Sequence, residues 1–129
     1  MSTHSSLAQV NVPSNKPWAL TAGLWVLQIG AAAMFLMAGG SKLAGAPEMV
    51  GLFDVIGVGQ WFRYLTGVIE VGSAVMLLIP SLAFYGAALL VPTMIGAVLT
   101  HLFIVGGSPA IALVLLLAVA TIAWARRPR

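Results

Sequence analysis

The sequence predicts an all-α fold: a bundle of four transmembrane helices that run up-down-up-down, with a short amphipathic helix between the first two. Hydrophobic residues make up 60% of the 129-residue chain and charged residues only 7%, whereas a soluble domain carries about 25% charged residues. Four apolar segments reach the length of about 20 residues that a helix needs to cross a bilayer. Such a chain has too few polar groups to cover a surface in water, so we expect a lipid bilayer around it.

The chain begins with a polar stretch, residues 1–17, which is rich in Ser and Asn and has no hydrophobic period. We expect a flexible cytoplasmic tail there. Residues 18–43 follow as the first predicted transmembrane helix. A cleaved signal peptide is the alternative, but the apolar run from Trp18 to Ala38 is longer than the hydrophobic part of a typical signal.

The segment between the first two spans predicts a short amphipathic helix. Pro47 suits a first helical position, and Gly57 and Gly59 supply a stop. Apolar residues recur at i, i+3, i+4 and i+7, namely Met49, Leu52, Phe53 and Ile56. We expect this helix to lie in the membrane interface or to fold back over the mouth of the bundle.

The remaining predicted spans are residues 61–79, 82–105 and 109–125, and residues 126–129 form a basic cytoplasmic tail. The second and third spans are joined at Pro80-Ser81, and the third and fourth at residues 106–108. Such short connections require neighbouring helices to be antiparallel. The four spans together form one transmembrane domain, residues 18–125.

Lysine and arginine residues indicate the orientation, because they favour the cytoplasmic side. An even number of spans places both tails on one side, with Lys16, Arg126, Arg127 and Arg129. The opposite side has Lys42 and Arg63, balanced by Glu48 and Asp54. We therefore expect a multi-pass protein of the cell's inner membrane with both termini in the cytoplasm. No basic stripe is interleaved with aromatic residues, so we expect no nucleic-acid partner.

Glu70 is the most informative residue because it lies near the middle of the second span. An acid at that depth is costly unless it is paired, protonated or wetted by a cavity. Its helical neighbours at spacings of three to seven are polar or small, namely Arg63, Thr66, Gly67, Ser73 and Ala74. This face should point into the bundle. Glu70 either locks two helices together or acts as a functional acid or ligand-binding group.

Two further helices contribute polar residues to the same half of the membrane. Lys42 shares a face of the first span with Gln28 and could reach Glu70 or Asp54; the alternative is a lysine that snorkels to the interface. Gly39 and Gly40 precede Lys42 and would let another backbone come close. His101 lies near the end of the third span and suits a proton relay or a carbonyl contact; the alternative is a hydrogen bond to a neighbour. The candidate ligand-binding cluster is Lys42, Arg63, Glu70 and His101, supported by Gln28, Asp54, Thr66 and Ser73.

The sequence lacks the residues that several kinds of chemistry require. The chain has no cysteine, so it holds no Fe–S cluster and no Cys-ligated metal. His101 and Glu70 alone are too few ligands for a metal site. Ser41 and Ser73 belong to no motif that pairs a nucleophile with a base. Redox chemistry would need a quinone, another cofactor or a partner subunit.

The chain resembles the DoxX-like family over residues 20–125. The resemblance is carried by the run Gly39 to Leu43, by Phe53, Gly57 and the run Trp61 to Glu70, and by Met94 to Ala97 with His101. It implies a small four-helix membrane protein whose polar positions are Lys42, Arg63, Glu70 and His101. Some relatives are linked to thiosulfate oxidation coupled to quinone, and others to membrane-associated oxidative-stress complexes.

Three functions are compatible with these observations, and they leave open whether the protein is an enzyme. The first is a small oxidoreductase-associated subunit that binds a quinone or another amphiphile in a polar intramembrane pocket. The second is a non-enzymatic scaffold that binds a partner subunit or a second copy, with a purely structural polar cluster. The third is a small transporter.

Overall fold

The computed structural model describes residues 16–128, and these residues form helices and connections but no strand. The helices are α1 (Lys16–Ala44), α2 (Pro47–Ile56), α3 (Gln60–Leu77), α4 (Ala83–Thr100), the π-helical turn η1 (His101–Val105) and α5 (Ala110–Ala125). The all-α class predicted from the sequence is confirmed. Most of the predicted N-terminal tail lies outside the described residues, and α1 already begins at Lys16.

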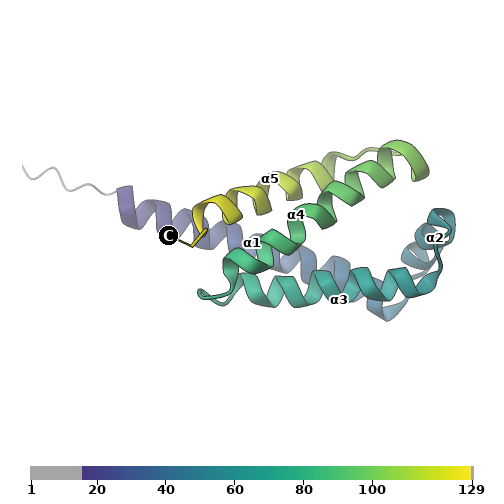
Figure 1. Ribbon diagram of the computed structural model, residues 1–129, viewed down its shortest axis with the longest axis horizontal. Coiled ribbons are helices and arrows are strands. Elements are labelled where there is room, and N and C mark those ends of the chain that lie inside the picture. The colour runs from purple at the N-terminus through teal and green to yellow at the C-terminus, as the bar shows by residue number, and fades with distance from the viewer. Residues whose placement is uncertain (1–15, 129) are drawn as a thin grey trace, which may run out of the picture.

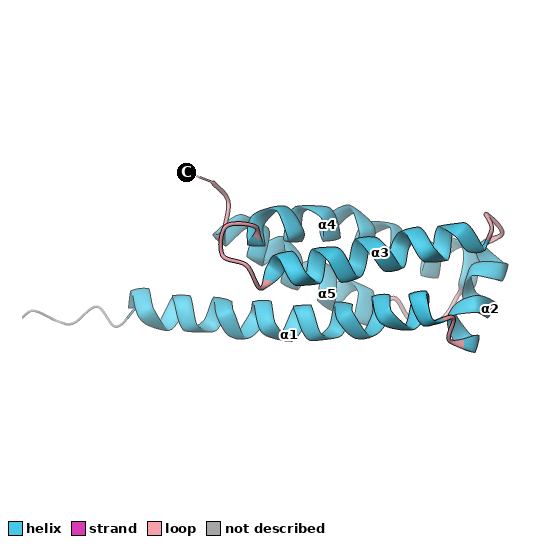
Figure 2. Cartoon of the chain, turned by 90° about the horizontal axis from the view of Figure 1, so that it is seen from below, coloured by secondary structure: helices cyan, strands magenta, loops and turns pink. Residues whose placement is uncertain are grey.

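The long helices alternate in direction along the chain (Figures 1 and 2). Helix α1 packs mainly against α3, and α4 packs mainly against α5, while α1 and α5 touch only lightly. The two pairs lie together near the turn between α3 and α4 and diverge toward the end where α2 lies (Figure 1). The helices therefore form two antiparallel pairs that open toward α2, rather than a bundle closed along its whole length.

Glycines let α1 and α3 approach closely. A Cβ atom on Gly39 would lie 2.9 Å from the carbonyl oxygen of Gly67, and one on Gly67 would lie 3.1 Å from the carbonyl oxygen of Gly39. Small residues at such a crossing bring two backbones into contact. Of the two glycines singled out in the sequence, only Gly39 has this role, because nothing lies within 4 Å of a Cβ on Gly40.

The apolar core fills the end of the molecule away from α2. Its buried residues come from all four long helices and are Ala31, Ala32, Phe35, Ala74, Leu77, Ala87, Leu90, Met94, Val119 and Ile122. Many large apolar side chains point outward instead, among them Val68 and Phe103, which are 59% and 78% exposed. An exterior with this many exposed apolar side chains is unfavourable in water and favourable in lipid.

Within residues 16–128, two helical segments are long and apolar enough to cross a bilayer, Pro17–Ala44 and Ala83–Val105. Helix α5 is also apolar but shorter, and α3 contains the buried Arg63 and Glu70. Together with the apolar exterior, these segments indicate a membrane protein.

The third predicted span changes helical type near its end. Helix α4 contains Pro92 and gives way to η1 at His101, where the amide of Gly106 donates to the carbonyl oxygen of His101 at 3.0 Å. A single π-turn at the end of an α-helix often occurs at a functional site. Apolar periodicity does not distinguish π from α over five residues, so the sequence predicts one continuous helix here.

Candidate functional site

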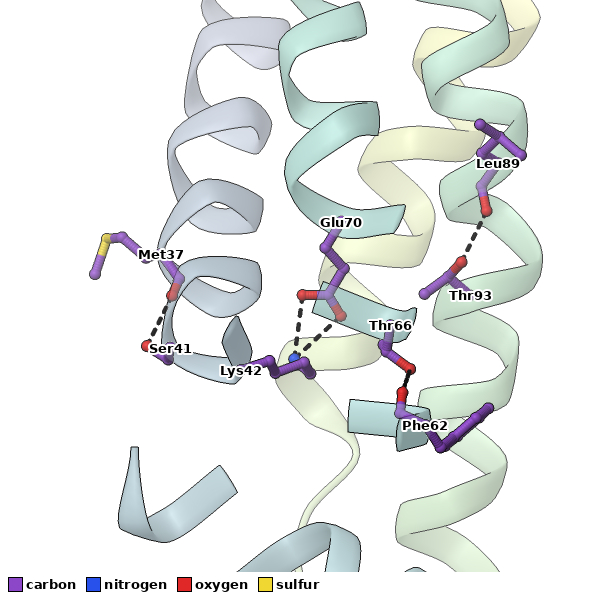
Figure 3. A network of polar contacts seen from close by, with 8 residues as sticks. All are labelled: Met37, Ser41, Lys42, Phe62, Thr66, Glu70, Leu89 and Thr93. Carbon is purple, nitrogen blue, oxygen red and sulfur yellow. Dashed lines mark hydrogen bonds and ion pairs between the residues drawn. The ribbon is translucent and has the colours of Figure 1, made fainter. Parts of the chain in front are cut away.

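An ion pair joins α1 to α3 in the interior. Lys42 Nζ lies 3.1 Å from both Glu70 Oε1 and Glu70 Oε2 (Figure 3). Lys42 is 9% exposed and Glu70 is 2% exposed. Glu70 therefore turns toward a charged partner on the neighbouring helix, as the cost of an acid in an apolar interior demands. Of the two partners considered for Lys42 in the sequence, it reaches Glu70.

Arg63 lies behind this pair and fixes its position. The guanidinium donates through Nη1 to the carbonyl oxygen of Lys42, and through Nε to Gln60 Oε1 at 2.7 Å. The carbonyl oxygen of Lys42 belongs to the last turn of α1, where carbonyls lack α-helical partners and attract cations. Arg63 is only 5% exposed, and it anchors the end of α1 on α3.

Gln60 extends the polar chain to α2. Its Nε2 donates to Asp54 Oδ1 at 2.8 Å and to the carbonyl oxygen of Val50 at 3.0 Å. Polar contacts thus link α2 through Gln60 and Arg63 to the backbone of Lys42, whose side chain pairs with Glu70. Gln60 was not among the site residues predicted from the sequence; its place directly after Gly59, at the first turn of a helix, was the available signal.

A cavity of about 500 Å³ opens beside the ion pair. Lys42, Thr66 and Glu70 line it from α1 and α3, and His101 lines it from the start of η1. Helix α4 adds Thr93 and Thr100, and the predicted apolar face of α2 covers one end with Met49, Leu52, Phe53 and Ile56. Most of the remaining lining is apolar, with Phe35, Phe62, Leu65, Ile69 and Leu115 among its members.

His101 is half-buried and has a defined hydrogen-bond partner. Its Nδ1 lies 3.2 Å from the carbonyl oxygen of Gly106. A carbonyl oxygen only accepts, so Nδ1 carries the proton. In the neutral ring, Nε2 is then a hydrogen-bond acceptor. The bond closes the π-turn and holds the imidazole at the wall of the cavity.

The structure gathers part of the cluster predicted from the sequence. Lys42, Thr66, Glu70 and His101 all line the cavity, whereas Arg63 supports the ion pair from behind. Asp54 is exposed and joins only through Gln60. Two of the expected supporting residues, Gln28 and Ser73, do not line the cavity. Ser73 is 1% exposed, and its hydroxyl has no hydrogen-bond partner among residues 16–128.

Gln28 belongs to a different polar contact, at the opposite end of α3. Its Nε2 donates to the carbonyl oxygen of Leu77 at 2.8 Å, and its Oε1 accepts from Arg126 Nε at 2.8 Å. Leu77 is the last residue of α3, so Gln28 satisfies a carbonyl at a helix end. Gln28 therefore lies apart from the cluster around Glu70, because its side chain is engaged here. Arg126 is likewise more than part of a basic tail.

Within residues 16–128, no group of three or more His, Asp, Glu or Cys side chains is placed to hold a metal ion. The charged and polar side chains beside the cavity can instead bind a polar headgroup, and its apolar walls can accommodate a hydrocarbon tail.

Comparison with known proteins shows which family the sequence resembles. The sequence model of the DoxX-like family matches residues 26–125. No curated protein and no solved structure matches the chain.

Proposed function

This chain belongs to the DoxX-like family, and on that premise we propose that it is a small oxidoreductase-associated membrane subunit that binds a quinone or another amphiphile. The observation that carries the proposal is the cavity of about 500 Å³ that combines apolar walls with the Lys42–Glu70 pair and His101. Its volume falls within the range of about 300–1,000 Å³ typical of small-molecule sites. Mainly apolar walls with a few polar groups are also typical of such sites.

The proposal places the four long helices across the bilayer. Helix α3 has 18 residues, which gives a length of about 27 Å at 1.5 Å per residue, close to the hydrocarbon thickness of about 30 Å. Its charged residues Arg63 and Glu70 are buried, while Val68 and Val75 face outward. A helix whose charged side chains are buried and whose apolar side chains face outward can cross lipid, because neighbouring helices shield its charges.

The same arrangement places the cavity in the outer half of the inner membrane. The positive-inside rule favours the cytoplasm for Arg126 and Arg127 and therefore for both termini. The α2 end, with all three acidic residues of the chain (Glu48, Asp54 and Glu70), then lies toward the outside. An amphiphile dissolved in that leaflet could enter from the side. Because the chain has no cysteine, a bound amphiphile or a partner subunit would carry the electrons.

A structural role is the second candidate, and one observation favours it. Lys42 engages both oxygens of Glu70, and Arg63 engages the backbone of Lys42. These contacts would hold α1, α3 and α2 in register for a partner subunit or a second copy, even if nothing entered the cavity. A transporter is less favoured, because the apolar core with Leu77, Leu90 and Ile122 fills the other half of the molecule.

Binding of a short-tailed benzoquinone to the purified protein in lipid nanodiscs separates the two candidates. We expect His101→Ala to weaken binding of the reduced, hydroquinone form of this probe at least tenfold while the protein stays folded, because Nε2 of His101 can accept from its hydroxyl group. Thr121→Val is the control, because Thr121 is exposed on α5 and outside the cavity. Unchanged binding in both His101→Ala and Glu70→Gln would remove the ligand-binding function and leave the structural one.

A further inference from the structure

We propose that the cavity selects an amphiphile whose headgroup donates hydrogen bonds, namely a hydroxylated aromatic ring such as an alkylphenol or a hydroquinone, over one that only accepts them. This inference rests on the proposed function, because it assumes that an amphiphile occupies the cavity. It follows from the hydrogen bonds that the lining side chains already make within the protein.

The threonines of the cavity have already used their hydroxyl protons. Thr66 donates to the carbonyl oxygen of Phe62 at 2.8 Å, and Thr93 donates to that of Leu89 at 2.8 Å (Figure 3). Thr100 makes the same type of bond, to the carbonyl oxygen of Gly96 at 2.7 Å. A hydroxyl has one proton and two lone pairs. Each of these oxygens can therefore accept a bond from a ligand but has no proton left to donate.

Like the threonines, His101 offers a ligand a hydrogen-bond acceptor and no donor. Its Nδ1 proton is directed at the carbonyl oxygen of Gly106. Among residues 16–128, the imidazole ring of His101 makes a hydrogen bond only through Nδ1, which leaves Nε2 available. In the neutral imidazole, Nε2 has a lone pair and no proton, so it too accepts.

The ion pair adds further acceptor capacity. The Lys42 ammonium has three protons and directs donors at both oxygens of Glu70. A carboxylate has about four lone-pair sites, so Glu70 keeps acceptor sites after binding Lys42. One ammonium proton of Lys42 remains as a donor.

Donors are scarcer than acceptors around the cavity. Among the described side chains that line the cavity, the donors are the remaining proton of Lys42 and the hydroxyl of Ser108. The oxygen of Ser108 accepts from the amide of Ala110 at 3.2 Å, and its proton can still be donated. Ser108 is exposed. Acceptors come from Thr66, Glu70, Thr93, Thr100 and His101. A carbonyl or ether headgroup would place its own acceptors against these oxygens and this nitrogen, whereas a hydroxyl group would pair with them.

The walls favour an aromatic ring next to the hydroxyl group. Phe35, Phe53 and Phe62 all line the cavity, and the rings of Phe53 and Phe62 lie 5.8 Å apart at 55°. Tilted aromatic neighbours of this kind pack favourably with a further ring. A phenolic ring with an alkyl tail therefore fits both the polar and the apolar part of the lining.

A matched pair of ligands tests the inference: 4-nonylphenol and its methyl ether differ only in the donor proton and one methyl group. Their affinities are measured by titration against the full-length protein in lipid nanodiscs, with empty nanodiscs as the blank. We expect the phenol to bind at least tenfold more tightly than the ether. His101→Phe and Thr93→Val should each reduce this ratio severalfold, because each removes an acceptor. Thr121→Val should leave it unchanged, since Thr121 makes the same bond to a backbone carbonyl outside the cavity.

The outcomes separate the inference from the proposed function. Equal affinity for phenol and ether, or tighter binding of the ether, would overturn the donor preference while leaving an amphiphile site in place. Absence of binding by the phenol, the ether and the short-tailed benzoquinone would overturn the proposed function and the inference with it. A tenfold preference that His101→Phe and Thr93→Val both leave intact would also contradict the inference, because the preference would then arise elsewhere.

Discussion

Lys42 Nζ and the carboxylate of Glu70 lie 3.1 Å apart between α1 and α3, and both residues are buried. Twenty-eight positions separate them in the sequence, and the close contact of Gly39 with Gly67 brings their helices together. This pair forms one wall of the cavity and the end of the polar chain from α2. Five predictions follow from the ion pair, from the helices and polar contacts around it, and from the cavity beside it.

The first prediction concerns the ion pair itself. Removing one partner of a buried pair leaves an uncompensated charge and costs about 3–5 kcal/mol. We expect Glu70→Gln and Lys42→Met each to lower the free energy of unfolding by that order, measured by SDS titration. The double variant should lose clearly less than the sum of the two, because no lone charge remains. Additive losses would show that the two side chains do not interact in the membrane.

The second prediction concerns the crossing of α1 and α3. A Cβ atom on Gly39 would meet Val71 Cγ2 at 2.8 Å and the carbonyl oxygen of Gly67 at 2.9 Å. Gly39→Ala should therefore destabilise the protein by about 1–3 kcal/mol, the usual cost of overpacking. Gly40→Ala is the matched control, since its Cβ has open space, and should be neutral or slightly stabilising. Equal effects of the two substitutions would place the helix crossing elsewhere.

The third prediction concerns Gln60, which links α2 to Arg63. Gln60→Leu removes the acceptor of Arg63 Nε and the donor to Asp54. An unsatisfied buried polar group costs about 1–3 kcal/mol, and we expect a loss of stability in that range. Asp54→Asn should have little effect, because Asp54 is exposed and an amide oxygen still accepts. If the Gln60→Leu protein were as stable as the Asp54→Asn protein, the polar contacts through Gln60 would contribute nothing to the stability of the fold.

The fourth prediction concerns orientation in the membrane. The chain has no cysteine, so single introduced cysteines report accessibility without background. Val58 lies between α2 and α3, Ser81 lies between α3 and α4, and both are exposed. A membrane-impermeant maleimide should label Val58→Cys in intact cells and label Ser81→Cys only after lysis. The reverse pattern would invert the orientation, and labelling of both in intact cells would rule out that α3 crosses the bilayer.

The sequence predicted the helices and the inward face of α3 because apolar periodicity and the cost of a buried charge are local properties. It gave Glu70 and Asp54 as possible partners of Lys42, with a snorkelling lysine as the alternative, and the three-dimensional contact with Glu70 distinguishes among them. The partner of Gln28 was missed, because the contact with Arg126 spans 98 positions and depends on how α5 ends. The π-turn at His101 and the divergence of the two helix pairs were not predicted, because apolar periodicity in one sequence reports neither a single turn of another helical type nor how helices are arranged in space.

The fifth prediction tests the central claim most directly, namely that the cavity beside Lys42 and Glu70 binds an amphiphile. Gly96 lines the cavity, and a Cβ on it meets nothing within 4 Å. Gly72 is equally open but lies outside the cavity, so Gly72→Phe is a matched control for Gly96→Phe. Titration of 4-nonylphenol and of the short-tailed benzoquinone in nanodiscs should show binding lost in Gly96→Phe and retained in Gly72→Phe, with both proteins folded. Retained binding of both ligands in a folded Gly96→Phe protein would contradict the claim.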